Sequence, residues 1–186
     1  MKQRLWALLV CGSALAITPL AYAQNYDFTY SSGANFASGQ ITISGTPSVS
    51  GNNVISGSID YNSTTLALYP NPSPLSISTS PAGAFYYDNV LYPLGGPGTY
   101  LDIDGLLFTN PGDTEEINIW SNGATINDSF YQFVPGLGYV QADNTGTFTL
   151  TAVPEYGSVS MLIICALGLA GAFFYKGRKS GLFLNF

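Results

Sequence analysis

The central part of the chain, residues 24–153, contains no lysine, arginine, histidine or cysteine. Neither salt bridges nor disulfides can therefore stabilise this body, so its fold must depend on buried apolar surface and backbone hydrogen bonds. Ten of the 11 acidic residues of the chain lie in the body: Asp27, Asp60, Asp88, Asp102, Asp104, Asp113, Glu115, Glu116, Asp128 and Asp143. The five cationic residues lie near the two ends of the chain: Lys2, Arg4, Lys176, Arg178 and Lys179.

Apolar and polar residues alternate along the body with the period of two that is typical of strands. Gly, Pro, Asn and Ser separate the alternating segments, which are 26–30, 40–44, 54–61, 65–69, 84–92, 116–120, 130–134 and 146–151. None of the body carries a helical period. About ten short strands at this spacing predict an all-β class, as a single β-sandwich-like domain of short antiparallel strands or a flattened barrel. We expect this domain to span residues 24–152.

Turn-forming residues divide the body at three places. Residues 69–74 carry three prolines, which predict a loop separating two sheets because proline has no backbone N–H. Asp104-Gly105 lies between alternating residues 100–103 and 106–109, and Asn122-Gly123 occupies a similar place farther on. Both dipeptides favour a hairpin with a type I′ turn, which needs positive φ at both central residues.

Residues 1–23 have the three parts of a secretory signal peptide. Lys2 and Arg4 form a charged start, and an apolar region follows at residues 5–17. A small-x-small pattern then predicts signal cleavage at Ala21, Ala23 and Gln24. We therefore expect the body to be exported.

A second apolar segment, residues 159–175, carries no charge over 17 positions. As a helix rising about 1.5 Å per residue it would reach roughly 25 Å, near the lower limit for crossing a bilayer. A basic cluster follows it directly: Lys176, Arg178 and Lys179. By the positive-inside rule, this cluster predicts a cytoplasmic C-terminus and a body on the outer side of the membrane.

The order of a Pro-Glu motif, one hydrophobic span and a basic cluster resembles the PEP-CTERM sorting signal of Gram-negative bacteria that make exopolysaccharide. Val153, Pro154 and Glu155 match the motif, and Tyr156 stands where the family usually has a second proline. The resemblance covers residues 153–186. It implies recognition and cleavage by exosortase, a membrane enzyme, and hence a precursor anchored in the inner membrane that ends at the cell surface or in the extracellular matrix.

The absence of Lys, Arg, His and Cys from the body excludes several functions. Without Lys or Arg it cannot neutralise phosphates, so we expect no binding to nucleic acid. Without His, Lys or Cys it lacks the bases and nucleophiles of Ser-His-Asp and Cys-His catalysis, and only oxygen donors remain for a metal. Glycosidases use paired acids, but Glu115 and Glu116 alternate faces on a strand, and Asp102 and Asp104 flank a turn. We therefore expect no enzymatic activity.

The stretch from Asp102 to Gly105 also resembles half of a calcium loop of the Asp-x-Asp-x-Asp-Gly kind. The full loop needs further oxygen ligands downstream, where this chain has Leu106, Leu107 and Phe108. The hairpin interpretation therefore fits better. We expect no cofactor, and keep Asp102 and Asp104 as the candidate calcium ligands.

Aromatic residues make up 14% of the chain. Most aromatic side chains of a β-domain pack in its core or across strands, but the neighbours Tyr86 and Tyr87 cannot both point inward. Exposed rings offer surfaces on which sugars can stack. The candidates for such a face are Tyr86, Tyr87, Tyr92, Tyr100, Trp120, Tyr131 and Tyr139.

Together these features predict an exported, exosortase-sorted protein of the surface or extracellular matrix, with a structural or interaction role. Two alternatives remain open: a glycan-binding module of the exopolysaccharide matrix, and a permanently anchored single-pass membrane protein. The expected partners are the exosortase, the membrane through the C-terminal helix, and exopolysaccharide.

Overall fold

The computed structural model describes residues 23–33, 35–96, 98–122 and 127–154. These residues form antiparallel strands without a helix, which confirms the predicted all-β class. The strands are β1 (Gln24–Ser32), β2 (Asn35–Ile43), β3 (Asn52–Tyr61), β4 (Thr64–Leu68), β5 (Ser78–Thr79), β6 (Tyr86–Tyr87), β7 (Val90–Leu91), β8 (Leu106–Thr109), β9 (Glu116–Ser121), β10 (Asp128–Val134) and β11 (Gly138–Ala152).

The chain divides into two compact units, Met1–Thr151 and Ala152–Phe186. The predicted signal peptide, apolar span and basic cluster fall outside the described residues, apart from the cleavage-site residues Ala23 and Gln24. Within the part of the chain that is described, no helix has the length and hydropathy needed to cross a membrane.

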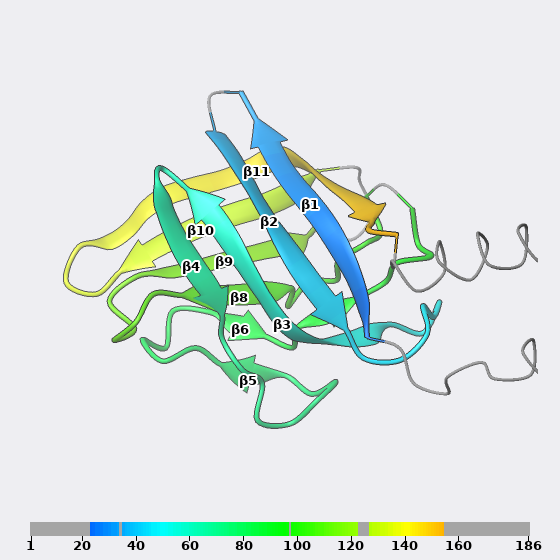
Figure 1. Ribbon diagram of the computed structural model, residues 1–186. Coiled ribbons are helices and arrows are strands. Elements are labelled where there is room, and N and C mark those ends of the chain that lie inside the picture. Colours follow the sequence, from blue (N-terminus) through cyan, green and yellow to red (C-terminus); the bar gives the residue numbers. More distant parts are fainter. Residues whose placement is uncertain (1–22, 34, 97, 123–126, 155–186) are drawn as a thin grey trace, which may run out of the picture. The chain divides into compact units, whose positions relative to one another are not determined.

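Eight of the strands form one sheet that closes on itself, in the order β2-β1-β11-β10-β9-β8-β4-β3, with β3 pairing back to β2. Figure 1 shows β1 to β4 as a front layer crossing β8 to β11 behind it. Of the two predicted architectures, the closed sheet agrees with the flattened barrel, whereas a sandwich would have two separate sheets. The layers are instead joined on both sides, by β1 with β11 and by β4 with β8. Closure pairs the backbone groups that free sheet edges would leave open.

The main core lies between the two layers. Alternation along β1 buries Tyr26, Phe28 and Tyr30, while the residues between them are exposed or half-buried. The ring of Phe28 stacks on Phe148 of β11 at a centroid distance of 5.3 Å and contacts Phe108 of β8 at 5.9 Å. Burial of such rings contributes about 2 to 3 kcal/mol each, so aromatic packing holds the layers together without ion pairs.

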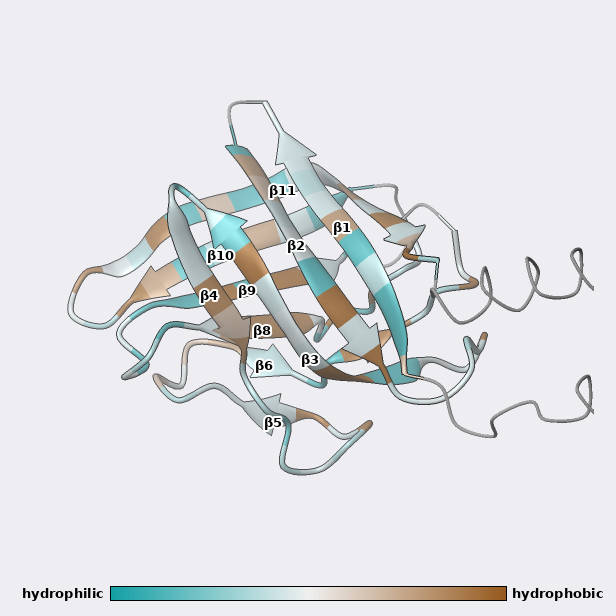
Figure 2. Cartoon of the chain, in the orientation of Figure 1, coloured by the Kyte–Doolittle hydropathy of each residue, from teal (hydrophilic) through white to brown (hydrophobic). Residues whose placement is uncertain are grey.

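The segment between β4 and β8 covers the outer surface of β8 and β9. It starts with the predicted proline-rich loop and carries β5, β6 and β7. Glu116 of β9 is fully buried beneath it and accepts hydrogen bonds from the Ser80 hydroxyl and the Ala82 N–H, each at 2.7 Å. Because β8 faces the core on one side and this segment on the other, all four of its residues are buried. In Figure 2, β8 is coloured mainly as hydrophobic, whereas hydrophilic and hydrophobic colours alternate along β1 and β2.

Two sequence predictions in this region are wrong. Residues 84–92 form two short strands rather than one, with Asn89 between them at φ 54°. Residues 100–103 form no strand, so there is no hairpin at Asp104-Gly105, and β8 pairs with β4 and β9 instead. Gly105 has φ 69°, whereas Asp104 is not among the residues of positive φ, so the turn is not type I′. The other hairpin was predicted at Asn122-Gly123. The strands on either side of it, β9 and β10, do pair, but residue 123 lies outside the described residues.

Candidate functional site

Three acidic side chains converge beside the covering segment. Asp88 lies between β6 and β7, and Asp102 and Asp104 precede β8; carboxylate oxygens of the three lie within 4.8 Å of one another. The N–H of Asn89 donates to the Gly105 carbonyl at 3.0 Å, which ties the two loops together. We call these three residues the acidic cluster. The sequence predicts Asp102 and Asp104 as ligands but not Asp88, because nothing local to Asp88 indicates its distant partners.

Burial gives the acidic cluster unusual protonation behaviour. Loss of hydration raises the pKa of Asp88 from 3.8 to about 7, and the charges of Asp102 and Asp104 act in the same direction. Burial, followed by the charge of Asp102, also raises the pKa of Asp104. The same two causes raise the pKa of Tyr92 to about 12, so its hydroxyl stays protonated as a donor. Asp88 therefore holds a proton up to near neutral pH.

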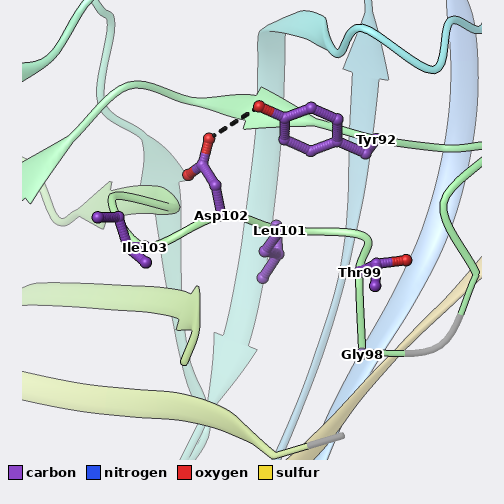
Figure 3. Close-up of a pocket in the computed structure, with 6 residues that line it drawn as sticks. All are labelled: Tyr92, Gly98, Thr99, Leu101, Asp102 and Ile103. Atoms are coloured by element: carbon purple, nitrogen blue, oxygen red, sulfur yellow. Dashed lines mark hydrogen bonds between the residues drawn. The ribbon is translucent and has the colours of Figure 1, made fainter. Parts of the chain in front are cut away.

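A cavity of about 270 Å³ lies next to the cluster, lined by Tyr92, Gly98, Thr99, Leu101, Asp102 and Ile103. Figure 3 shows the Tyr92 hydroxyl donating to Asp102, with an oxygen–oxygen distance of 3.1 Å. A glycosidase needs two carboxyl groups that both reach the substrate. Only Asp102 of the cluster lines this cavity, and Asp88 is 7% exposed. A molecule bound in this cavity would therefore meet one carboxylate and not an acid–base pair.

The acidic cluster is also the place where a hard cation could bind. Calcium takes six to eight oxygen ligands, and the cluster supplies three carboxylates. Both oxygens of Asp102 already accept hydrogen bonds: Oδ1 from the N–H groups of Asp104 and Gly105, and Oδ2 from Tyr92. Oδ1 of Asp88 likewise accepts from the Val90 N–H. Three of the six carboxylate oxygens of the cluster therefore already accept hydrogen bonds within the protein.

We accordingly expect calcium to leave the thermal stability unchanged. Thermal melting is measured at about 10 mM calcium. This concentration exceeds the Kd of about 0.1 to 1 mM typical of extracellular calcium modules, so a bound ion would raise the Tm visibly. Magnesium at the same concentration controls for ionic strength. A calcium-specific rise in Tm that Asp104→Asn abolishes would show that the cluster binds the ion.

A second group of residues forms an aromatic face on the outside of β9, β10 and β11. Its members are Phe85, Trp120, Tyr131, Phe133 and Tyr139. Trp120 and Tyr131 lie 4.6 Å apart between ring centroids, and Tyr139 meets Phe133 at 5.3 Å and Tyr131 at 5.8 Å. Phe85 of the covering segment contacts Trp120, Phe133 and Tyr139. Tyr139 is 54% exposed, and Trp120, Tyr131 and Phe133 are half-buried.

The seven aromatic candidates therefore separate into different environments. Trp120, Tyr131 and Tyr139 belong to the aromatic face. Tyr86 is 67% exposed and makes no ring contact with the face. The other three pack elsewhere: Tyr87 is buried, Tyr92 contacts the acidic cluster and Tyr100 packs against the main core. Phe85 and Phe133 were not among the candidates predicted from the sequence. The alternation of residues 131 and 133 on one strand could have found Phe133, whereas Phe85 comes from a distant segment.

The predicted sorting residues border the folded body. Gln24 begins β1, and Val153 and Pro154 follow the end of β11. Ala21, Glu155 and the basic cluster lie outside the described residues. Comparison of the chain with protein-family models, with curated proteins and with solved structures finds no match.

Proposed function

We propose that this chain is an exported protein that exosortase sorts to the cell surface or the extracellular matrix, where its body has a structural or interaction role. The observation that carries the proposal is the distribution of charge. All five cations lie in residues 2–4 and 176–179, next to the two apolar segments, while the body between them is acidic. That distribution is expected of a body that leaves the cytoplasm and a tail that stays there.

The fold is compatible with such a location. The closed sheet has paired strands all round and needs neither a disulfide nor an ion pair, so its stability does not depend on the redox state of the compartment. An interaction role is favoured over catalysis because the body has no His, Lys or Cys to act as a base or nucleophile. In the proposed mechanism the apolar span holds Val153, Pro154 and Glu155 at the outer face of the membrane, where a membrane enzyme can cleave.

Cleavage predicts that the mature surface protein lacks residues 159–175. Mass spectrometry of protein recovered from the surface should find a C-terminus near Glu155, because β11 ends at Ala152 and the motif follows directly. Replacing both Pro154 and Glu155 with alanine should leave the precursor full-length and in the membrane fraction. Asp113→Ala, which removes one acid of the body, is the matched control and should be processed normally.

Two outcomes would overturn parts of this proposal. An intact 159–175 peptide on surface protein means permanent anchoring without processing. A body that resists added protease on intact spheroplasts, but is digested after lysis, means that it is not exported. The second result would contradict the whole proposal, and the first only its exosortase step.

A glycan-binding role is the second candidate function. It is favoured by the aromatic face, which leaves part of several rings open to solvent on rigid strands. The two roles are compatible, because sorting depends on the ends of the chain and binding would depend on the body.

A further inference from the structure

We propose that the aromatic face binds a chain of neutral sugars, with Trp120 and Tyr131 as its central contacts. This inference rests on the interaction role proposed above and assigns to it a surface and a class of partner. It is carried by the arrangement of the rings, by polar groups that lack a partner and by the charge of the body.

The ring arrangement suits the apolar faces of pyranose rings. Trp120 and Tyr131 come from the neighbouring strands β9 and β10, and their ring planes meet at 42°. Both rings are half-buried: they pack against the small buried cluster of Phe85, Tyr87 and Leu107, and part of each ring stays open to solvent. Farther along, Tyr139 stands nearly perpendicular to Tyr131, at 88°. Successive rings thus offer both faces and edges, against which C–H groups of a sugar can pack.

Polar groups without a partner accompany these rings. Within the described residues, neither the indole N–H of Trp120 nor the hydroxyl of Tyr131 has a hydrogen-bond partner. Ser129 lies opposite Trp120 on the neighbouring strand, and its hydroxyl donates to Oδ1 of the exposed Asn144 at 3.0 Å. That bond leaves the amide N–H₂ of Asn144 without a partner in the described part of the chain. Sugar hydroxyls and ring oxygens would satisfy these donors.

The aromatic face is held in place before any ligand arrives. The hydroxyl of Tyr139 donates to the Ala84 carbonyl at 2.9 Å, which fastens the end of the face to the covering segment. Phe85 then packs edge-on against Tyr139 at 5.8 Å and against Phe133 at 6.4 Å. Because the rings are already ordered, binding loses little side-chain entropy.

The negative charge of the body indicates which kind of molecule can bind to the aromatic face. The body has ten acidic residues and no cationic ones, so anionic polysaccharides, nucleic acids and anionic lipid surfaces are repelled. A second copy of the body carries the same charge and is repelled as well. A neutral polysaccharide meets no such penalty, and it offers the hydroxyls that the free donors of the face require.

Retention on immobilised polysaccharides tests this inference. The full chain, in a nonionic detergent without a sugar headgroup, should be retained by neutral β-1,3-glucan or β-1,4-glucan and not by anionic polygalacturonate. Tyr131→Ala and Trp120→Ala should each weaken retention by about tenfold, since aromatic contacts contribute about 1 to 1.5 kcal/mol. Phe36→Ala, at a 59% exposed ring on β2 in the other layer, is the matched control and should bind like the wild type.

Each other outcome would overturn the inference. These outcomes are no retention on either neutral polymer, stronger retention on the anionic one, or wild-type retention by both Trp120→Ala and Tyr131→Ala at unchanged Tm. Sedimentation showing a dimer that Tyr131→Ala dissociates would assign the face to a second copy. Binding to phosphatidylcholine vesicles would assign it to a lipid surface. Surface delivery of Trp120→Ala is measured in parallel, so a failure of glycan binding is distinguished from a failure of export.

Discussion

Replacing Gly105 with alanine should lower the free energy of unfolding by about 3 to 4 kcal/mol, a large part of the stability of a domain of this size. A Cβ at this position would lie 2.1 Å from the Ile119 carbonyl oxygen and 2.7 Å from the Cβ of Trp120. The clash is with backbone, which cannot rotate away, and the φ of 69° adds strain of about 1 kcal/mol for a residue with a side chain. Denaturant unfolding followed by circular dichroism measures the loss.

A control substitution separates the clash from the strain of positive φ. It is made at a glycine that also has positive φ but has no atoms near the place of its Cβ. Gly136 has φ 87°, and nothing lies within 4 Å of where its Cβ would be. Gly136→Ala should therefore cost only about 1 kcal/mol. If Gly105→Ala costs no more than this control, the close approach of residues 105 and 119 is incorrect. Because Gly105 also connects Asn89 to Asp102, its replacement should disturb the acidic cluster as well.

Stability should fall by about 2 to 3 kcal/mol as the pH rises from 5 to 8. The pKa of Asp88 is about 7 in the folded protein and 3.8 when it is unperturbed. Between these values the folded state keeps a proton that the unfolded state has lost. The stabilising contribution is therefore complete below pH 4 and disappears as the pH passes 7. The raised pKa of Asp104 acts in the same direction. The pKa of Asp143 is lowered to about 2, so protonation of Asp143 reduces the stability of the fold only in stronger acid.

Asp88→Asn isolates this effect. Asparagine keeps an oxygen for the Val90 N–H but has no proton to lose, so the decline in stability between pH 5 and pH 8 should become much smaller. A small decline should remain, because the pKa values of Asp104 and Asp128 are also raised. The variant should also be more stable than the wild type at pH 8. Asp27→Asn removes one charge from an exposed position on β1, outside the cluster, and should keep the wild-type decline. A decline in Asp88→Asn as large as that of the wild type would contradict the assignment of the proton to Asp88.

Local pattern was enough to predict most strands but not their arrangement. Tyr26, Phe28 and Tyr30 alternate with polar neighbours, and the structure buries all three as that pattern requires. Turn chemistry was less dependable. At Asp104-Gly105, the Asp102 side chain accepts from both backbone N–H groups and forms a different turn from the one that the dipeptide favours in hairpins.

The sequence by itself determined the all-β class, the acidic body free of ion pairs and the proline-rich break after β4, because alternation, charge and missing N–H groups are properties of neighbouring residues. Only the tertiary structure decided that the sheet closes, that Asp88 joins Asp102 and Asp104, and that Phe85 meets Trp120. Each of these contacts joins segments far apart in the chain. They follow from strand order and register, which packing between layers sets and no local pattern contains.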